Sequence, residues 1–137
     1  MLVNDEHFDN WSQLKKQINQ SNDSGKRIKE SEIWWAHLGV NIGSEMNGSL
    51  SSLNYQRPVL VIKKFNRALF LTVVLSSKHK NNRYYKRLAD DKSSVILSQI
   101  RILSAKRFVR RVRKLNKQEF EQIKGSVVSM LKNELPA

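Results

Sequence analysis

Residues 32–62 read EIWWAHLGVNIGSEMNGSLSSLNYQRPVLVI, two apolar runs separated by a polar connection rich in glycine, serine and asparagine. The first run, residues 33–38, stops at Gly39, and the second begins beside Pro58. Short apolar runs bounded by glycine and proline are typical of β-strands. The connection is longer than most structureless loops in a compact domain, which indicates that it is either functional or disordered.

Two polar motifs border this loop, Gly43-Ser44-Glu45 and Gln56-Arg57-Pro58. A residue before proline favours extended backbone geometry, so Arg57 is expected to project in a fixed direction where the second strand starts. A loop glutamate and a strand-end arginine can then point towards one place. We therefore predict a site that contains Glu45 and Arg57.

The middle of the chain contains six strand-like runs. They cover residues 33–38, 58–65, 69–76, 83–88, 94–103 and 109–114. Several short strands separated by turn signals predict a small, strongly bent barrel or sandwich.

An amphipathic helix is predicted over residues 5–19, with Asn4 or Asp5 as its cap. The apolar positions recur at near-helical spacing: Phe8, Trp11, Leu14 and Ile18. Residues 21–25, SNDSG, then read as a linker. We expect Trp11 to dock the helix on the barrel rather than to stack on a nucleobase.

A second helix is predicted at the C-terminus, where Asn116 and Glu119 form a cap pair. Its apolar face comprises Phe120, Ile123, Val127, Leu131 and Leu135, before Pro136. Gly125 within it costs about 1 kcal/mol relative to alanine, which packing of the apolar face can offset.

Length and composition indicate one domain with a single core, since the chain has 137 residues. It contains no cysteine, which excludes disulfides and cysteine-bound metals and suits a reducing compartment. No apolar run approaches the ~20 residues of a membrane span, and the N-terminus lacks the features of a signal peptide. We expect a soluble cytoplasmic protein that has no membrane partner.

The net charge of +13 is concentrated in the central part of the chain. Residues 46–118 contain 18 Lys and Arg against two acids, or +16, while the flanking parts contain 7 basic and 10 acidic residues, or −3. Such segregation favours binding to the phosphates of a nucleic acid over simple solvation of the surface. An acidic protein partner could use the same charge.

Four motifs in this order resemble the MazF/PemK family of toxin endoribonucleases. They are Gly43-Ser44-Glu45, Arg57-Pro58 with its aliphatic strand, Leu75-Ser76-Ser77-Lys78, and SVILSQIR at residues 94–101. The resemblance covers roughly residues 30–135. The chain departs from the family pattern in having Ser76 where threonine is commoner, a longer loop at residues 47–56, and an additional segment at residues 1–29.

The resemblance implies an α+β, mainly β fold, an SH3-like small β-barrel of the MazF/CcdB/Kid type with a C-terminal helix. We expect residues 1–29 to form a helical extension with a linker, and residues 30–137 to form the toxin domain. The family also implies a homodimer, a cognate antitoxin and a single-stranded RNA substrate. The alternative is a non-catalytic barrel of the same fold that binds a protein such as gyrase, or a nucleic-acid-binding module.

RNA can be cleaved without a metal when its own 2′-hydroxyl attacks the adjacent phosphorus, provided that the protein orients the strand and stabilises the anionic phosphorane. The fork of Arg57 suits two phosphoryl oxygens; its alternative roles are a surface phosphate contact or a salt bridge with Glu45. Ser76 can donate one hydroxyl, and the family assigns this role to it rather than to Ser77. Strand neighbours point to opposite faces, so one of the two serines faces the groove.

Proton transfer requires further groups. The resemblance assigns acid and base work to Arg57, but arginine is a poor base near neutral pH because it stays protonated. Glu45 and His79 are therefore candidate proton acceptors. Glu45 could instead hold the loop or Arg57, and His79 could bind phosphate; His37 is expected to be an ordinary strand residue.

A basic run after Ser76 suits single-stranded RNA, since cations can follow the backbone while bases stack on aromatic faces. The predicted RNA-binding residues are Ser77, Lys78, Lys80, Arg83, Tyr84, Lys86 and Arg87. The alternative is a strand with one of Tyr84 and Tyr85 in the core. A second basic run, residues 106–114, is compatible with a strand that has a solvated face.

No cofactor is expected. The three histidines, His7, His37 and His79, lack metal-ligand spacing, and the chain has no glycine-rich phosphate loop. Together with the family resemblance, this implies a metal-independent, sequence-selective endoribonuclease that leaves a cyclic phosphate and a free 5′-hydroxyl.

Overall fold

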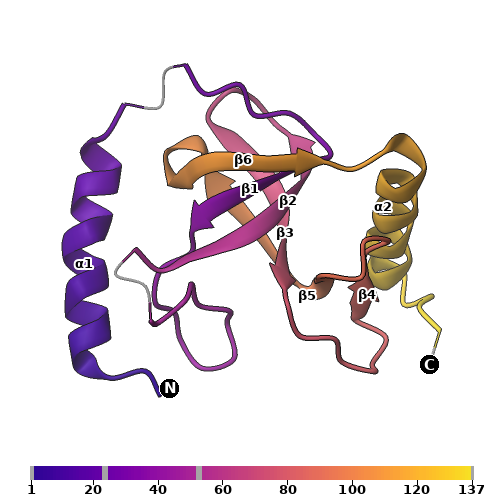
Figure 1. The fold of residues 1–137 in the computed structure, drawn as a ribbon, viewed down its shortest axis with the longest axis horizontal. Helices are drawn as coiled ribbons and strands as arrows, with labels where there is room; N and C mark the ends of the chain where they lie inside the picture. The colour runs from indigo at the N-terminus through magenta and orange to yellow at the C-terminus, as the bar shows by residue number, and fades with distance from the viewer. Residues whose placement is uncertain (1, 23–24, 52–53, 137) are drawn as a thin grey trace.

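The structure is a computed structural model that describes residues 2–22, 25–51 and 54–136. Two helices lie on opposite sides of one twisted sheet (Figure 1). Helix α1 comprises Asp5–Gln20 and helix α2 comprises Lys117–Leu131. A dominant sheet with two separate helices confirms the α+β, mainly β class.

Six antiparallel strands form the sheet in the order β4-β5-β3-β2-β1-β6. In the described part of the chain the edge strands β4 and β6 do not pair, so the curved sheet is not closed into a complete barrel. The strands are β1 (Glu32–His37), β2 (Gln56–Lys64), β3 (Leu69–Ser76), β4 (Tyr85–Arg87), β5 (Ser94–Ser104) and β6 (Phe108–Lys114), and the short 3-10 helix η1 (Ala105–Arg107) joins β5 to β6.

All six predicted strands are confirmed, with each end within two residues of its predicted position. Strand β4 starts two residues later than expected, at residue 85 rather than residue 83. Asn82 ends the preceding loop instead, because its side-chain oxygen accepts from Tyr84 N and its carbonyl accepts from Tyr85 N. The turn therefore occupies the first two predicted strand residues.

Strand β2 is buried on both faces, because successive side chains of a strand point to opposite sides. Leu60 and Ile62 join the apolar cluster that includes the buried face of α2, whereas Val59 and Val61 join the cluster on the other face. The run VLVI is therefore fully apolar although it belongs to an antiparallel sheet. This double burial fixes the register of β2 at the centre of the molecule.

Helix α2 begins as predicted, with Asn116 Oδ1 accepting from Glu119 N at 2.8 Å. Its apolar face differs from the prediction at the C-terminal end: Leu131 is 73 % exposed, and Leu135 lies beyond the helix. The helix ends at Leu131, and Asn133 takes a left-handed conformation with φ 58°. Met130 packs against the core, and the chain then turns back so that Leu135 contacts the same cluster from outside the helix.

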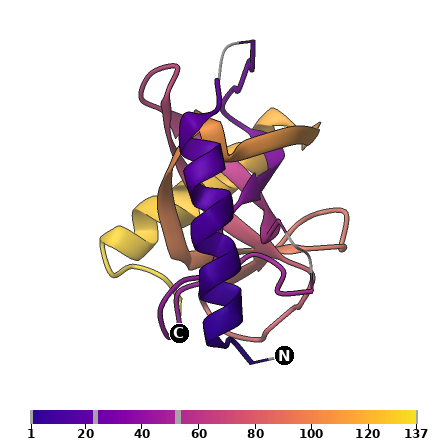
Figure 2. The same ribbon diagram turned by 90° about the vertical axis from the view of Figure 1, so that its left-hand side faces the viewer.

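Helix α1 begins at the N-cap Asn4, whose side chain accepts from His7 N while the His7 ring accepts from Asn4 N. It packs against the end of the sheet that is remote from α2 (Figure 2). Of the predicted linker at residues 21–25, residues 23 and 24 lie outside the described residues.

Trp11 joins α1 to the sheet, as expected from the sequence. The side chain is 7 % exposed and packs edge-on against Tyr55, with ring centroids 6.2 Å apart. The guanidinium of Arg107 lies 5.7 Å from its ring centroid. Gly39 lies so close that a Cβ atom there would be 2.1 Å from Trp11 Cε2, and its φ of +79° also favours glycine. Gly39 is therefore required for the docking of α1.

Gly39→Ala should destabilise the fold more than Gly43→Ala. Both glycines have a positive φ, so both substitutions carry about 1 kcal/mol of backbone strain. A Cβ at Gly43 meets nothing within 4 Å, whereas one at Gly39 collides with Trp11. Urea unfolding should show an additional loss of about 2 kcal/mol for Gly39→Ala. Equal losses would show that Trp11 does not pack on Gly39.

Candidate functional site

Arg57 lies at the start of β2, opposite Ala36 of β1. Its Nε donates to the carbonyl of Asn47 at 2.8 Å, and in the described part of the chain its two terminal nitrogens make no hydrogen bond. Burial lowers the pKa of the Arg57 guanidinium, and the nearby Tyr85 opposes this in part. The loop thus fixes the orientation of the fork and leaves its two outer nitrogens available to an anion.

Ser76 ends β3 and is 6 % exposed. Its Oγ accepts from Lys78 N at 3.1 Å, which leaves the hydroxyl hydrogen available for donation. The β2–β3 pairing places Val59 opposite Val74. Continuing that register by two residues places Arg57 opposite Ser76, on the same face of the sheet.

Arg57 and Ser76 line one groove of about 760 Å³. Its apolar wall comes from β1, β6 and Pro58, and its polar wall from the loop after β4. The other lining residues are Ile33, Trp35, Ser49, Gln56, Pro58, Leu75, Ser77, Asp90, Lys92, Ser93, Val112 and Arg113. An apolar wall beside a pair of phosphate-binding groups suits a nucleotide, whose base and phosphate need different surroundings.

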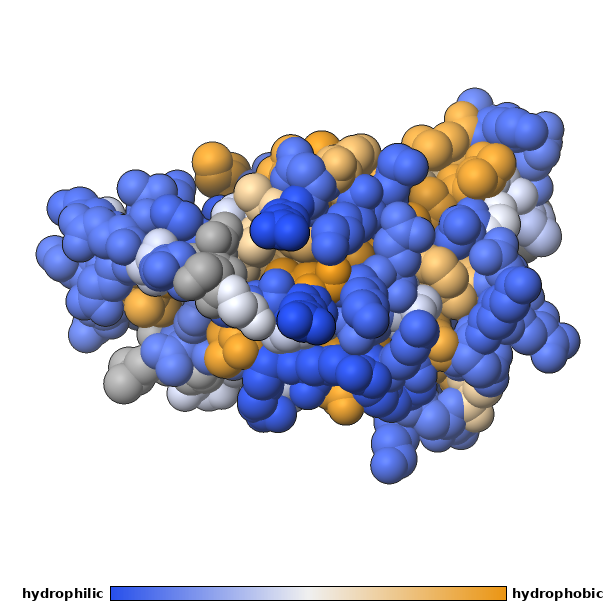
Figure 3. Space-filling view, turned by 90° about the horizontal axis from the view of Figure 1, so that it is seen from above, coloured by the Kyte–Doolittle hydropathy of each residue, from blue (hydrophilic) through white to orange (hydrophobic). Residues whose placement is uncertain are grey.

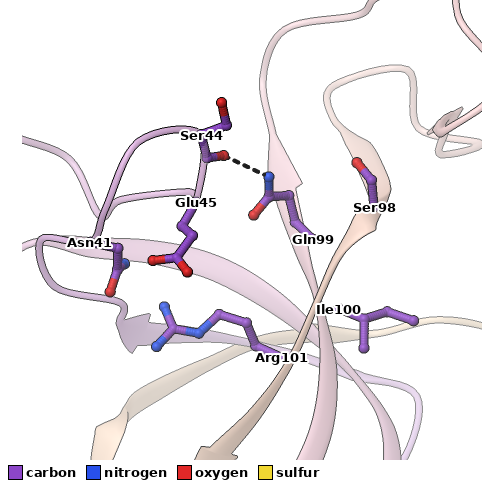
Figure 4. A pocket seen from close by; sticks show the side chains of 7 residues that line it. All are labelled: Asn41, Ser44, Glu45, Ser98, Gln99, Ile100 and Arg101. Carbon is purple, nitrogen blue, oxygen red and sulfur yellow. Dashed lines mark hydrogen bonds between the residues drawn. The ribbon is translucent and has the colours of Figure 1, made fainter.

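Glu45 lies on the other side of the loop. Its carboxylate accepts from Ile42 N at 3.0 Å and points towards Arg101 (Figure 4). Burial lowers the pKa of Arg101, and the charge of Glu45 opposes that shift. The two residues line a separate pocket of about 420 Å³. Glu45 also lines a pocket with Arg57, but it does not line the groove that contains Ser76.

The pocket around Glu45 is held together by Gln99 of β5. The Gln99 side chain donates to Ser44 O at 3.0 Å (Figure 4). It also accepts from Met46 N at 3.0 Å. The 94–101 motif on β5 thus fixes the position of the Gly43-Ser44-Glu45 loop. The sequence identified both motifs but gave no sign that they meet.

His79 lies outside the groove, and both ring nitrogens have partners. Nδ1 lies 2.7 Å from Ser94 Oγ, and Nε2 lies 3.1 Å from Asp91 O. A carbonyl only accepts, so Nε2 must carry a hydrogen. His79 therefore joins the loop after β3 to the start of β5.

The basic run surrounds the same edge of the sheet, although only Ser77 of the predicted RNA-binding set lines the groove. Lys78, Lys80 and Arg83 are exposed, and Lys86 is half-buried. Arg87 forms an exposed ion pair with Asp91 at 3.0 Å. The run thus adds positive charge beside the groove rather than within it.

The two tyrosines of this run have different surroundings. Tyr84 packs against the core cluster, and Arg83 lies 5.1 Å above its ring. Tyr85 lies near enough to Arg57 to influence its pKa, and the Lys80 ammonium is 5.6 Å from its ring centroid. One tyrosine in the core matches the alternative drawn from the sequence, and Tyr85 is the one closer to the site.

Sequence reasoning missed several groups at this site. Asn47 acts through its carbonyl, and backbone groups leave no signal in a sequence. Trp35 and Arg113 reach the groove because β1 pairs with both β2 and β6. Trp34 and Trp35 point to opposite faces of β1, and the sequence does not show which of the two reaches the groove. Trp34 packs edge-on against Phe108 instead.

The described residues contain no group of three or more His, Asp or Glu placed to hold a metal ion. They also contain no helix long and apolar enough to cross a membrane.

The fold and the groove define a class of small, basic β-proteins with an arginine and a hydroxyl side by side. A sequence model of the PemK-like, MazF-like toxins of type II toxin-antitoxin systems matches residues 29–131. The chain belongs to this family. No curated protein sequence matches it.

A solved structure supports the same fold. The chain is similar to the crystal structure of MazF (Form-I) from Deinococcus radiodurans, with a TM-score of 0.62 and 15 % sequence identity. The similarity covers 78 % of this chain and 98 % of that one. The predicted MazF-type fold is thereby confirmed.

Gly48→Ala should release Arg57 from the loop. A Cβ at Gly48 would lie 1.6 Å from Tyr55 O, so the neighbouring Asn47 carbonyl must move. NMR should detect slow exchange of the Arg57 Nε hydrogen in the parent protein and at least tenfold faster exchange in the variant. Gly125→Ala is the control: nothing lies within 4 Å of its Cβ, and it should stabilise α2 by about 1 kcal/mol without changing the Arg57 signal. Unchanged exchange in Gly48→Ala would contradict the proposed link.

Proposed function

We propose that this toxin is a metal-independent, sequence-selective endoribonuclease that cleaves single-stranded mRNA. The supporting observation is that Arg57 and Ser76 line one groove in a chain of the MazF-like family. The outer nitrogens of Arg57 suit two phosphoryl oxygens, and the Ser76 hydroxyl suits one.

In the proposed reaction the 2′-oxygen of a nucleotide attacks the adjacent phosphorus, and the bond from phosphorus to the 5′-oxygen breaks. The products are a 2′,3′-cyclic phosphate and a free 5′-hydroxyl. The 2′-hydroxyl loses a proton, and the leaving oxygen gains one. Arg57 and Ser76 stabilise the additional negative charge of the phosphorane, which is worth most in a partly buried site.

The identity of the group that accepts the proton of the 2′-hydroxyl is a separate part of the proposal. Glu45 and His79 are the candidates from the sequence, but Glu45 faces Arg101 and His79 bonds to Ser94 and Asp91. Either would have to act through a water or after a movement of its loop. Burial shifts the pKa of Arg57 downwards, the direction that proton transfer by Arg57 itself would need.

The proposed partners follow from the family. An antitoxin with an acidic segment would cover the groove, since the adjoining run of cations suits it as well as RNA. We further propose that the toxin acts as a homodimer in the cytoplasm, where its mRNA substrate occurs. The helical extension at residues 1–29 and the toxin domain at residues 30–137 stay a proposed division.

Purified protein should cleave single-stranded RNA in EDTA and leave cyclic phosphate ends. Arg57→Ala and Ser76→Ala should each lower kcat by about 10²-fold or more, because each removes a donor to the phosphorane. Product ends can be identified by mass spectrometry. Ser12→Ala, on the exposed side of α1, is a matched control for Ser76→Ala and should keep full activity.

Intact RNA with the parent protein would reject the endoribonuclease and favour a barrel that only binds. Cleavage that disappears in EDTA would reject the metal-independent mechanism while keeping the nuclease.

Glu45→Gln and His79→Asn distinguish the proton acceptors. Since neither side chain lines the groove that contains Ser76, each variant should retain kcat within about tenfold at neutral pH, less than the 10² to 10⁴ that general acid-base catalysis contributes. The pH dependence of kcat is the second measurement. A 10³-fold loss together with the disappearance of one limb of the profile would identify that residue as the base.

A further inference from the structure

A second basic groove lies between the segment after α1 and the hairpin that joins β2 to β3. Its volume is about 620 Å³. The lining residues are Gly25, Lys26, Arg27, Ile28, Lys29, Lys64 and Arg67, so five of the seven are cationic and none is acidic. One wall, residues 25–29, ends at the first residue of the family match, and the other wall comes from the end of β2 and the hairpin that follows it.

The groove is built from fixed parts. Ile28 is 1 % exposed and packs in the core, which holds Arg27 and Lys29 at the surface on either side. Glu30 Oε2 accepts from Lys64 N at 2.9 Å and so ties the segment to the hairpin. The walls are therefore in place before a ligand arrives.

A third tie comes from η1, which lies at the same end of the sheet as the hairpin. The Lys26 ammonium donates to Ala105 O at 3.2 Å, and Ala105 N donates to Ala68 O at 2.9 Å. The segment, the 3-10 helix η1 and the hairpin are thus joined in one unit. Hydrophilic side chains dominate the face seen from this end of the molecule (Figure 3).

The charge of this groove is not balanced within the described part of the chain. Arg27, Lys29, Lys64 and Arg67 form no ion pair there with an acidic side chain. The Glu30 carboxylate accepts from the backbone N–H of Lys64 and keeps its negative charge, which offsets only part of the charge of these cations. Four cations around one hollow repel each other, and a bound polyanion would relieve that repulsion.

We propose that this groove binds the phosphodiester backbone of the RNA strand at a distance from the point of cleavage. The inference rests on the proposed function, because it takes the substrate to be single-stranded RNA. Phosphates held here would raise the affinity for long RNA through release of counterions, without reading sequence.

RNA fits this groove better than an acidic protein does. Protein partners depend on buried apolar or aromatic anchors, but Ile28 is the one apolar lining residue besides glycine and its side chain is buried in the core. Phe65, 45 % exposed, lies on the same hairpin next to Lys64. An exposed aromatic beside cations is the combination that single-stranded nucleic acids use for stacking.

The two grooves lie at opposite ends of β2. Arg57 is the second residue of the strand and Lys64 is the last. Seven residues of extended strand span about 23 Å. A long RNA can therefore contact both places, whereas a short oligonucleotide held at Arg57 does not reach Lys64.

Binding should be measured by fluorescence anisotropy of an RNA of about 20 nucleotides, longer than the site sizes of most single-strand binders. The full chain carrying Arg57→Ala serves as the reference so that the RNA stays intact. Adding Lys64→Ala and Arg67→Ala should weaken binding at least tenfold at low salt. The slope of log affinity against log salt should fall by about 1.4, or 0.7 for each lost phosphate contact.

The controls separate location from net charge. Lys15→Ala with Lys16→Ala removes two exposed lysines from α1 and should leave both quantities unchanged. Lys64→Arg with Arg67→Lys keeps the charges and should bind like the reference. Unchanged RNA affinity and an unchanged salt slope in the variant with Lys64→Ala and Arg67→Ala would overturn the proposal. Polyglutamate is the probe for an acidic protein partner, and weaker binding of polyglutamate alone would not support RNA binding in this groove.

Cleavage by chains that retain Arg57 provides the second readout. With the long RNA, the double alanine variant should raise KM at least fivefold and leave kcat unchanged. With an oligonucleotide of about 4 nucleotides, at the lower end of single-strand site sizes, KM should stay the same. An equal rise for both lengths would overturn the proposal. If no RNA is cleaved by any chain, the proposed function fails, while the anisotropy result still decides whether this groove binds RNA.

Discussion

The functional groove depends on the way the long loop folds back on the root of the β1–β2 pair. The Tyr55 carbonyl accepts from Leu38 N at 3.0 Å and from Gly39 N at 3.2 Å, and Gly48 N donates to Gly39 O at 2.9 Å. Gly48 approaches Tyr55 so closely that no side chain fits there. The described residues on either side of this contact are consequently part of the packed structure, and the carbonyl next to Gly48 can hold Arg57. A mobile loop would leave the guanidinium free to adopt many orientations, which would cost the orientation that phosphate binding needs.

The same loop places Glu45 and Arg57 in different surroundings, although the sequence predicted that they share one site. Arg57 lines the groove with Ser76, whereas Glu45 faces Arg101 across the other pocket. Asn47 stands between them: its side chain accepts from Asn41 N, and its carbonyl accepts from Arg57 Nε. A salt bridge between Glu45 and Arg57 was one sequence hypothesis, and each partner is engaged elsewhere. The loop thus separates an arginine for the phosphate from an acid that balances a second arginine.

The N-terminal helix and the segment after it contact the protein near both ends of β2. Trp11 covers Gly39 and Tyr55, the residues on which the loop closes. The segment after the helix brings Lys26, Arg27 and Lys29 against the hairpin of β2 and β3. The flanking parts of the sequence have a net charge of −3, although they contain these three cations. A net charge over a segment does not show which of its residues lie together in the fold. Burial of Ile28 decides that these three cations lie on the sheet.

The sequence by itself determined the elements, because alternation, capping and breakers act over a few residues. It located six strands, both helices, the Asn116 cap and the docking role of Trp11, and it selected Arg57 and Ser76 through a family resemblance. The tertiary structure alone decided which candidates share a groove, since that depends on strand order and on backbone groups. It placed Trp35 and Arg113 beside Arg57, left Glu45 and His79 outside, and exposed Leu131 by ending α2 one turn early. Such contacts join residues far apart in the chain, and no local pattern encodes them.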